Sequence, residues 1–389
     1  MNILVACNSF KHSLSAVEAT KSIARGLHKA GLPAQHIQLF PVADGGDFTA
    51  DTLQFHLGGQ RYNVRCHDPL MRPIHARWLW LQEQRAAMIE MAAASGLRLL
   101  QPDELNPLQA HTFGTGELIL AALNRHPREI LIGVGGSATV DGGTGLLRAL
   151  GAVFLDRHGK ELTRLPMQLH RLHRIDDRAL EPLRNALQWK VLCDVEIPLL
   201  GPRGTVARYA SQKGATPAMM PHLEEALHRF AEVTLQQTGI SLLRHPGAGA
   251  AGGMAGGLHA WLGAALLPGA DFFLEYTNMN KALMHTDLVI TGEGKLDTQT
   301  LDGKAPLVVA QHAHVHQIPV VALAGEIPRH IPPSLQQHFD AIFSIVNGPG
   351  SLADHIAATR QHLFRTGTQI GRLLQAGLSF SQSYHSTKK

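Results

Sequence analysis

Glycines, hydroxyl groups and one carboxylate are concentrated in residues 135–143, which read Gly-Gly-Ser-Ala-Thr-Val-Asp-Gly-Gly. They directly follow the apolar run 130–134, as at a junction between a strand and a helix. Glycine lets the backbone approach a ligand closely and adopt positive φ. The backbone N–H groups and the start of a helix near Gly143 therefore predict an anion site. Asp141 is the charge there that could hold a metal ion, and an ordinary turn of small residues is the alternative.

Four further parts of the chain combine charged side chains with glycines or hydroxyl groups. They are 8–11, 43–47, 193–194 together with 211–214, and 291–300. Several carboxylates, several lysines and many backbone amides suit phosphoryl transfer, because that reaction depends mostly on positioning and on cations around the transferred group. Magnesium, which usually accompanies such chemistry, needs only one or two carboxylates from the protein.

Other motif-based functions fail on spacing. Gly303-Lys304 is followed by alanine and lacks the earlier glycine of a P-loop. Residues 247–252 match the glycine pattern of dinucleotide-binding folds, but the preceding residues 242–246 make a poor strand, so a close-packed helix or a loop is the favoured interpretation. The chain has no G-x-S-x-G and no H-E-x-x-H motif, which leaves hydrolase and zinc-protease functions without support.

The composition describes a globular protein rather than a nucleic-acid or membrane protein. The chain has 389 residues, enough for two domains, with 44% hydrophobic and 17% charged residues. Its formal charge of +4 comes from scattered basic residues, so we expect no nucleic-acid partner. No apolar stretch is long enough to cross a bilayer, and the N-terminus lacks the pattern of a signal peptide. We therefore expect a cytoplasmic protein without a membrane partner.

The segments named above must be positioned by strands and helices that alternate along the chain. Apolar runs predict strands at 3–7, 37–42, 129–134, 191–195, 287–291, 320–324 and 341–346. Helical patterns cover 16–30, 116–124, a segment from Pro217 to about 237, 305–316 and 352–374. Such alternation predicts an α/β fold with parallel sheets, in which ligands bind beyond the carboxyl ends of the strands. The polar segments follow those ends, so we expect them to converge.

Ten motifs, in order from residue 9 to residue 306, resemble the bacterial glycerate kinase type-1 family. They are Ser-Phe-Lys (9–11), Ala-Asp-Gly-Gly (43–46), Ile-Glu-Met-Ala-Ala-Ala-Ser-Gly-Leu (89–97), Thr-Phe-Gly-Thr-Gly-Glu (112–117), Gly-Gly-Ser-Ala-Thr with Asp-Gly-Gly (135–143), Pro-Leu-Leu-Gly-Pro (198–202), Gln-Lys-Gly-Ala (212–215), Gly-Ala-Gly-Ala-Ala-Gly-Gly (247–253), Thr-Gly-Glu-Gly-Lys-Leu-Asp-Thr-Gln-Thr (291–300) and Gly-Lys-Ala-Pro (303–306).

The resemblance implies an ATP-dependent kinase that phosphorylates D-glycerate with Mg²⁺, and it favours transfer to the C2 hydroxyl. It also implies two α/β domains with the active site between them. One is a discontinuous flavodoxin-like domain with a parallel sheet, which we expect at 1–75 plus 280–378. The other is inserted at 76–279, and the polar residues 379–389 are expected to form a disordered tail. The expected binding partners are glycerate and ATP. A second copy of the chain, in a homodimer, is a further partner considered.

Each candidate residue has an expected role. We expect Asp194 to act as the catalytic base, with Asp44 as second candidate and Lys11 as a cation for the substrate carboxylate or the ATP phosphates. The residues expected to bind the nucleotide are Gly135, Gly136, Ser137, Thr139 and Lys213. Those expected to bind glycerate are Ser9, Glu293, Lys295 and Asp297, while Asp141 is the expected metal ligand.

The chain departs from the family pattern beside these residues. Asn8 replaces an aspartate, His12 and Phe48 replace glycines, Val140 stands where asparagine is common, and Glu196-Ile197 replaces Asp-Asn. An amide can neither act as a base nor neutralise a cation, so any role of a carboxylate at position 8 is lost. Two alternatives follow: a non-catalytic homologue that binds glycerate or nucleotide, and a kinase of another small hydroxy acid.

Overall fold

The computed structural model describes residues 1–194 and 196–386, which form two compact units. Unit 1 comprises residues 1–44, 51–56 and the chain from 270 onward, whereas unit 2 comprises 45–50 and 57–269. The boundaries expected at 75/76 and 279/280 therefore lie earlier in the structure. The first differs because the residues just after 57 pair with strands of unit 2.

Unit 1 is built on a five-stranded sheet whose strands all run parallel. The strands are β1 (Ile3–Cys7), β2 (Ile37–Leu39), β11 (Leu288–Lys295), β12 (Val320–Glu326) and β13 (Ala341–Ser344). Read from one edge, their order is β2-β1-β11-β12-β13. Numbered within the unit this is 2-1-3-4-5, the flavodoxin-like order, whose switch point lies between β1 and β11.

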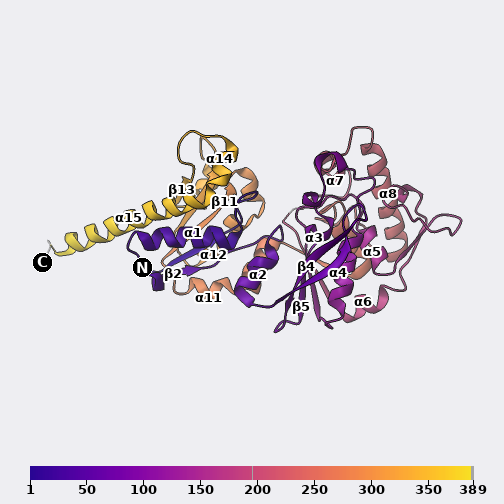
Figure 1. Cartoon of the computed structure of the whole chain (residues 1–389), viewed down its shortest axis with the longest axis horizontal. Coiled ribbons are helices and arrows are strands. Elements are labelled where there is room, and N and C mark those ends of the chain that lie inside the picture. Colours follow the sequence, from indigo (N-terminus) through magenta and orange to yellow (C-terminus); the bar gives the residue numbers. More distant parts are fainter. Residues whose placement is uncertain (195, 387–389) are drawn as a thin grey trace. The chain divides into compact units, whose positions relative to one another are not determined.

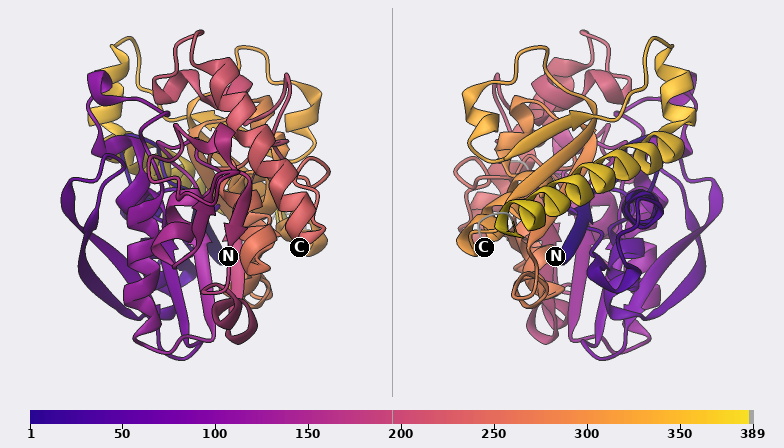
Figure 2. Two further views of the ribbon diagram at one scale, coloured as in Figure 1. Left: turned by 90° about the vertical axis from the view of Figure 1, so that its right-hand side faces the viewer. Right: turned by 90° about the vertical axis from the view of Figure 1, so that its left-hand side faces the viewer.

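Helices cover this sheet, and a helix from the start of the chain packs against one from its end. Those of unit 1 are α1 (Ala16–Lys29), most of α2 (Thr49–Leu57), α10 (Gly269–Tyr276), α11 (Met279–Leu283), α12 (Ala305–Val315), α13 (Pro333–Gln336), α14 (Leu352–Ala357) and α15 (Thr359–Ser386). Helix α15 runs alongside α1 (Figure 1). The two helices cover one face of the sheet (Figure 2), where Ile23, Leu363 and Ile370 join Val5 and Ile290 in one core.

Glycine makes the contact between α1 and α15 possible. A Cβ at Gly26 of α1 would lie 2.2 Å from the carbonyl oxygen of Phe364, and one at Gly367 of α15 would lie 2.6 Å from that of Ile23. Real Cβ atoms do not approach a backbone oxygen so closely. The first and last long helices of unit 1 therefore pack with their backbones in near contact.

Unit 2 is built on a mixed six-stranded sheet in the order β10-β9-β6-β5-β4-β3. Its strands are β3 (Gln60–His67), β4 (Pro73–Leu81), β5 (Ala86–Glu90), β6 (Glu129–Gly133), β9 (Gln188–Leu192) and β10 (Ala265–Leu267), with β7 (Val153–Leu155) and β8 (Arg174–Asp176) in a separate pair. Strands β5, β6, β9 and β10 run parallel, whereas β4 pairs antiparallel with β5 and β3 pairs antiparallel with β4.

The helices of unit 2 enclose a large apolar core that includes Trp78, Ile132 and Phe230. They are α3 (Ala92–Ser95), α4 (Phe113–Leu123), α5 (Thr144–Ala149), α6 (Glu181–Ala186), α7 (Thr205–Tyr209), α8 (Met220–Thr238) and α9 (Met254–Leu262). Helix α8 begins at Met220 with Pro221 in its first turn, three residues after the predicted Pro217.

The predicted α/β class with parallel strands is confirmed. Two sequence-based expectations near the C-terminus differ from the structure. The single helix expected at 352–374 is divided at Ala358 into α14 and α15. Helix α15 then continues to Ser386, so most of the tail expected to be disordered is helical, and only 387–389 lie outside the described residues. Within the part of the chain that the structure describes, no helix combines the length and apolarity needed to span a bilayer.

Candidate active-site residues

The switch point of the sheet in unit 1 gathers several of the predicted site residues. Asn8 and Lys11 follow the carboxyl end of β1, Glu293 lies in the last part of β11, and Asp44 follows β2 through a short extended segment. In a doubly wound sheet, neighbouring strands whose connections leave in opposite directions open a crevice at this edge. The sequence predicted convergence at such ends, and within unit 1 these residues do converge.

Asn8 acts as a hydrogen-bonding partner for Asp44. Its Nδ2 donates to Asp44 Oδ2 at 2.8 Å, and its Oδ1 accepts from Ser9 N at 2.7 Å. Asn8 and Ser9 are both buried, whereas Asp44 is half-buried. Because an aspartate at position 8 would bring a second negative charge to Asp44, the amide is physically compatible with this neighbour. The amide at position 8 thus replaces a carboxylate with a hydrogen-bond donor that orients the carboxylate of Asp44.

Glu293 is the most enclosed acid of this group, with 7% of its surface exposed. Its Oε1 accepts a hydrogen bond from Thr300 Oγ1 at 2.8 Å, and its Oε2 lies 3.8 Å from Lys304 Nζ. Burial raises the pKa of the Glu293 carboxyl to about 7, although Lys304 and the Thr300 hydrogen bond act in the opposite direction. Weaker electrostatic effects on this pKa come from Asp44, which raises it, and Lys11, which lowers it. Glu293 is therefore poised to exchange a proton near neutral pH.

Two neighbouring predicted residues form ion pairs on the surface instead. Lys295 Nζ lies 3.0 Å from Glu326 Oε1 and 3.8 Å from Asp297 Oδ2, and the Lys295 side chain is half exposed. The parallel register pairs Lys295 directly with Glu326 of β12. Asp297 also shapes its loop, because its backbone N–H donates to Thr300 Oγ1. The contacts of Lys295 thus differ from those of Glu293 two residues earlier.

Lys304 is the residue of this cluster to which the sequence reasoning gave no role. It is the N-cap of α12, which carries Pro306 in its first turn, and its side chain is about one quarter exposed. The Gly-Lys-Ala-Pro segment drew attention only as a failed P-loop and as a family motif. A lysine immediately before a proline-started helix, close after a glutamate at a strand end, is the signal that could have singled it out.

The glycine-rich loop of unit 2 follows β6 as predicted, and Lys213 lies behind it. Lys213 Nζ donates to Ser137 Oγ at 2.7 Å and to the carbonyl oxygen of Thr139 at 2.8 Å. Lys213 is 2% exposed, and this burial lowers the pKa of its ammonium group to about 7 while nearby Asp141 acts in the opposite direction. The hydroxyl of Thr139 is buried, and no described residue makes a hydrogen bond to it. The structure therefore brings together the loop residues and the lysine predicted for the nucleotide.

Asp141 occupies a different setting from the one expected of a metal ligand. It is fully buried, and its carboxylate accepts four hydrogen bonds: from Thr112 N at 2.9 Å, Thr112 Oγ1 at 2.8 Å, Gly143 N at 3.0 Å and Gly145 N at 3.1 Å. A Cβ at Gly145 would lie 2.7 Å from Thr112 N, so only glycine permits this approach. The predicted anion site at the start of α5 is thus occupied by the chain's own carboxylate, which favours a structural role for Asp141.

Asp194 follows β9, and its Oδ1 accepts a hydrogen bond from Gly269 N at 2.9 Å. Gly269 is the first residue of α10, so the carboxylate caps that helix. The side chain is half-buried, and Oδ1 is directed to the backbone. Asp194 therefore combines a structural contact with partial access to solvent.

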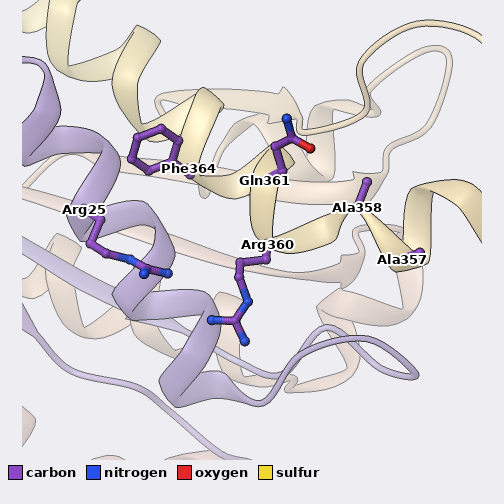
Figure 3. A pocket seen from close by; sticks show the side chains of 6 residues that line it. All are labelled: Arg25, Ala357, Ala358, Arg360, Gln361 and Phe364. Atoms are coloured by element: carbon purple, nitrogen blue, oxygen red, sulfur yellow. The ribbon is translucent and has the colours of Figure 1, made fainter.

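The cavity in Figure 3 lies apart from all the predicted site residues. It has a volume of about 470 Å³ and is lined by Arg25, Ala357, Ala358, Arg360, Gln361 and Phe364. Arg360 is already paired with Glu18 of α1. A second cavity, between α1 and the edge strand β2, shares Arg25 with the first, is also lined by Glu18, and contains none of the predicted residues. Among residues 1–194 and 196–386, no group of three or more His, Cys, Asp or Glu side chains is arranged to hold a metal ion.

Comparisons with known proteins agree over nearly the whole chain. A family model described as the glycerate kinase family matches residues 3–375. The chain is 40% identical to the glycerate kinase of Bacillus subtilis (strain 168), covering 95% of this chain and 97% of the relative. It is 37% identical to the glycerate 2-kinase of Escherichia coli (strain K12), covering 97% and 99%. A solved structure from Salmonella typhimurium LT2, described as a candidate glycerate kinase 2, superposes with a TM-score of 0.85 at 36% identity, covering 97% and 99%.

Proposed function

Because this chain belongs to the glycerate kinase family and is therefore a kinase, we propose that it transfers a phosphoryl group from ATP to D-glycerate. The observation that carries the proposal is the family match across residues 3–375, which includes both units. A kinase activity disfavours the non-catalytic alternative raised by Asn8. Incubating the purified protein with D-glycerate, ATP and Mg²⁺, and following ADP release, tests the proposal directly.

We assign the transfer to the C2 hydroxyl, which gives 2-phosphoglycerate. The name of the Escherichia coli relative, glycerate 2-kinase, supports this choice. C2 and C3 are adjacent carbons, and a displacement of about 1 Å changes which hydroxyl is aligned for a positioned reaction. A ³¹P NMR spectrum of the product, compared with both authentic phosphoglycerates, decides between them. A 3-phosphoglycerate signal would overturn the assignment, and turnover of a different hydroxy acid alone would support the kinase of another substrate.

The nucleotide phosphates are assigned to the loop of unit 2 that contains Gly135, Gly136, Ser137 and Thr139. Glycine at position 136 has φ +70°, so backbone N–H groups can turn toward an anion. Among the described residues the Thr139 hydroxyl has no hydrogen-bond partner, but it is fully buried, so a phosphate oxygen would reach it only if the loop opened. Lys213 acts from behind the loop: it holds Ser137 and the carbonyl of Thr139, and an adjacent phosphate would favour its charged form.

Asp194 remains the first choice for the base and Asp44 the second. Removing a proton from the attacking hydroxyl typically contributes about 10²–10⁴-fold to a rate. Comparing kcat of Asp194→Asn and Asp44→Asn with the wild type ranks them, because the amide retains an acceptor for Gly269 N or Asn8 Nδ2. A loss smaller than about tenfold in Asp194→Asn would exclude that residue as the base and leave Asp44.

The predicted magnesium ligand does not fit a metal. All the hydrogen bonds to Asp141 come from groups of the protein, and the carboxylate is enclosed. Magnesium requires accessible oxygens and keeps several waters. We therefore assign Asp141 to the architecture of the loop, and none of the residue roles proposed above depends on a metal ion.

A further inference from the structure

Lys304 and Glu293 form an incompletely satisfied ion pair at the switch point of unit 1. Glu293 Oε1 is held by Thr300, but Oε2 lies 3.8 Å from Lys304 Nζ, beyond the range of a hydrogen bond. The lysine side chain is about one quarter exposed, whereas that of the glutamate is 9% exposed. The Lys304 side chain is therefore more accessible to a ligand from solution than the Glu293 carboxylate is.

The surroundings of Glu293 determine what a new negative charge would do there. The groups that act on it are Lys304 from the start of α12, Lys11 after β1, Asp44 after β2, and the Thr300 hydroxyl. Of these, the two lysines favour the ionised carboxylate and Asp44 opposes it. An anion bound at Lys304 would add a second opposing charge and reduce the attraction of Lys304 for Glu293.

We infer that Lys304 binds an oxyanion of the substrates and that Glu293, its counter-ion in the free enzyme, takes up a proton when the anion arrives. The inference rests on the proposed function, which supplies two such oxyanions: the carboxylate of glycerate and the phosphates of ATP. The step is a proton transfer from solvent to a Glu293 oxygen, with no covalent bond to the ligand. Lys304 is thus a substrate-binding residue, and Glu293 couples binding to pH.

Glu293 is well placed for this coupling because its pKa is already about 7. At pH 7.5, a ligand that raised this pKa by about one unit would increase the protonated fraction from roughly one quarter to three quarters. Binding would then take up roughly half a proton per site. Uptake with ATP is not by itself diagnostic, because Lys213, whose pKa is also about 7, would take up a proton beside a phosphate; the part that depends on Glu293 identifies the coupling.

Isothermal titration calorimetry of the full-length wild type at pH 7.5 tests the coupling. D-glycerate alone and ATP alone are each titrated in two buffers with different ionisation enthalpies. We expect Glu293→Gln, which retains an acceptor for Thr300, to lower the proton uptake by roughly half a proton with one ligand, and that ligand identifies the oxyanion. Uptake with neither ligand, or unchanged uptake in Glu293→Gln, would overturn the inference.

Kinetics provide the second measurement. We expect Lys304→Met to raise KM for the same ligand at least tenfold and Lys304→Arg to restore part of the loss. The matched control is Lys281→Met, which removes an exposed lysine of α11 outside the cluster and should leave both KM values unchanged. Unchanged KM values in a folded Lys304→Met would refute the binding role. Failure of the wild type to make phosphoglycerate would refute the proposed function instead. The calorimetric result would still test whether ligand binding is coupled to protonation of Glu293.

Discussion

Asp141 in unit 2 and Glu293 in unit 1 are both buried carboxylates near the carboxyl ends of parallel strands, yet their surroundings differ. Asp141 accepts four hydrogen bonds from backbone and hydroxyl donors. Glu293 accepts one, and its other oxygen faces a lysine at 3.8 Å. A buried charge with a full set of donors is part of the architecture, whereas one with an incomplete set responds to ligands and pH. Burial alone does not distinguish the two roles; the number of donors does.

The most severe test of this comparison removes the Asp141 carboxylate. Asp141→Ala leaves the Thr112 hydroxyl and three backbone N–H groups without their acceptor, so we expect a loss of about 4 kcal/mol in the free energy of unfolding. Urea unfolding measures this loss. A variant within about 1 kcal/mol of the wild type would contradict the structural role.

The pH dependence of stability should reveal the different character of Glu293. Its folded-state pKa, about 7, lies above the ordinary value of 4.5, so the folded state holds this proton more tightly. The stability that this tighter proton binding gives to the folded state is fully present below about pH 4.5 and is lost as pH rises through about 7. Relative to wild type, Glu293→Gln should therefore gain roughly 3 kcal/mol in unfolding free energy between pH 4.5 and pH 8. A constant difference across this range would mean that Glu293 titrates normally.

The stability contributed by Lys213 in unit 2 should depend on pH in the opposite direction. Burial lowers the pKa of its ammonium group from 10.5 to about 7, so the unfolded chain binds this proton more tightly. The wild type should gain stability relative to Lys213→Met as pH rises from 7 toward 10. At pH 7 the variant should also lose about 2 kcal/mol, because Ser137 Oγ and the carbonyl of Thr139 lose their donor. Parallel unfolding curves at pH 7 and pH 9.5 would argue against the shifted pKa.

The smallest effect is expected from the single donor to Glu293. Thr300→Val removes the hydroxyl with little change in shape, and should cost about 1 kcal/mol in unfolding free energy. Because the hydrogen bond lowers the pKa of Glu293, its loss should also move the calorimetric proton uptake to higher pH. Thr298→Val, an exposed threonine in the same loop, is the matched control and should leave the pH of uptake unchanged.

Much of the site could be predicted because it depends on local patterns. Apolar runs identified β1, β6 and β11, and parallel sheets place ligands after such strands, which singled out Asn8, Gly135 and the 291–300 segment. The setting of Asp141 could not be predicted, since two of its donors belong to Thr112, 29 residues earlier. Lys304 was missed for a related reason: its partner Glu293 becomes apparent only when the turn at 298–302 brings the start of α12 back to β11.

The boundaries of the units and of α15 were also harder to predict, because they depend on contacts between residues far apart in the sequence. The antiparallel pair β3 and β4 joins the sheet of unit 2 through register with β5, which an apolar pattern alone does not reveal. The continuation of α15 beyond 378 was missed because its sequence is polar. Its earlier residues are anchored by the glycine contact with α1, a feature of packing rather than of composition.

That contact has a consequence for how the chain is made. Strand β1 pairs with β11, so that Ala6 accepts a hydrogen bond from a residue 285 positions later, and α1 packs on the last helix. As the protein leaves the ribosome, nearly all of unit 2 emerges before β11 exists. Domains generally fold as units during synthesis. Unit 2 can therefore fold first. Strand β1 and helix α1 pack fully only after β11 and α15 have been synthesised, and until then the apolar face of α1 is uncovered.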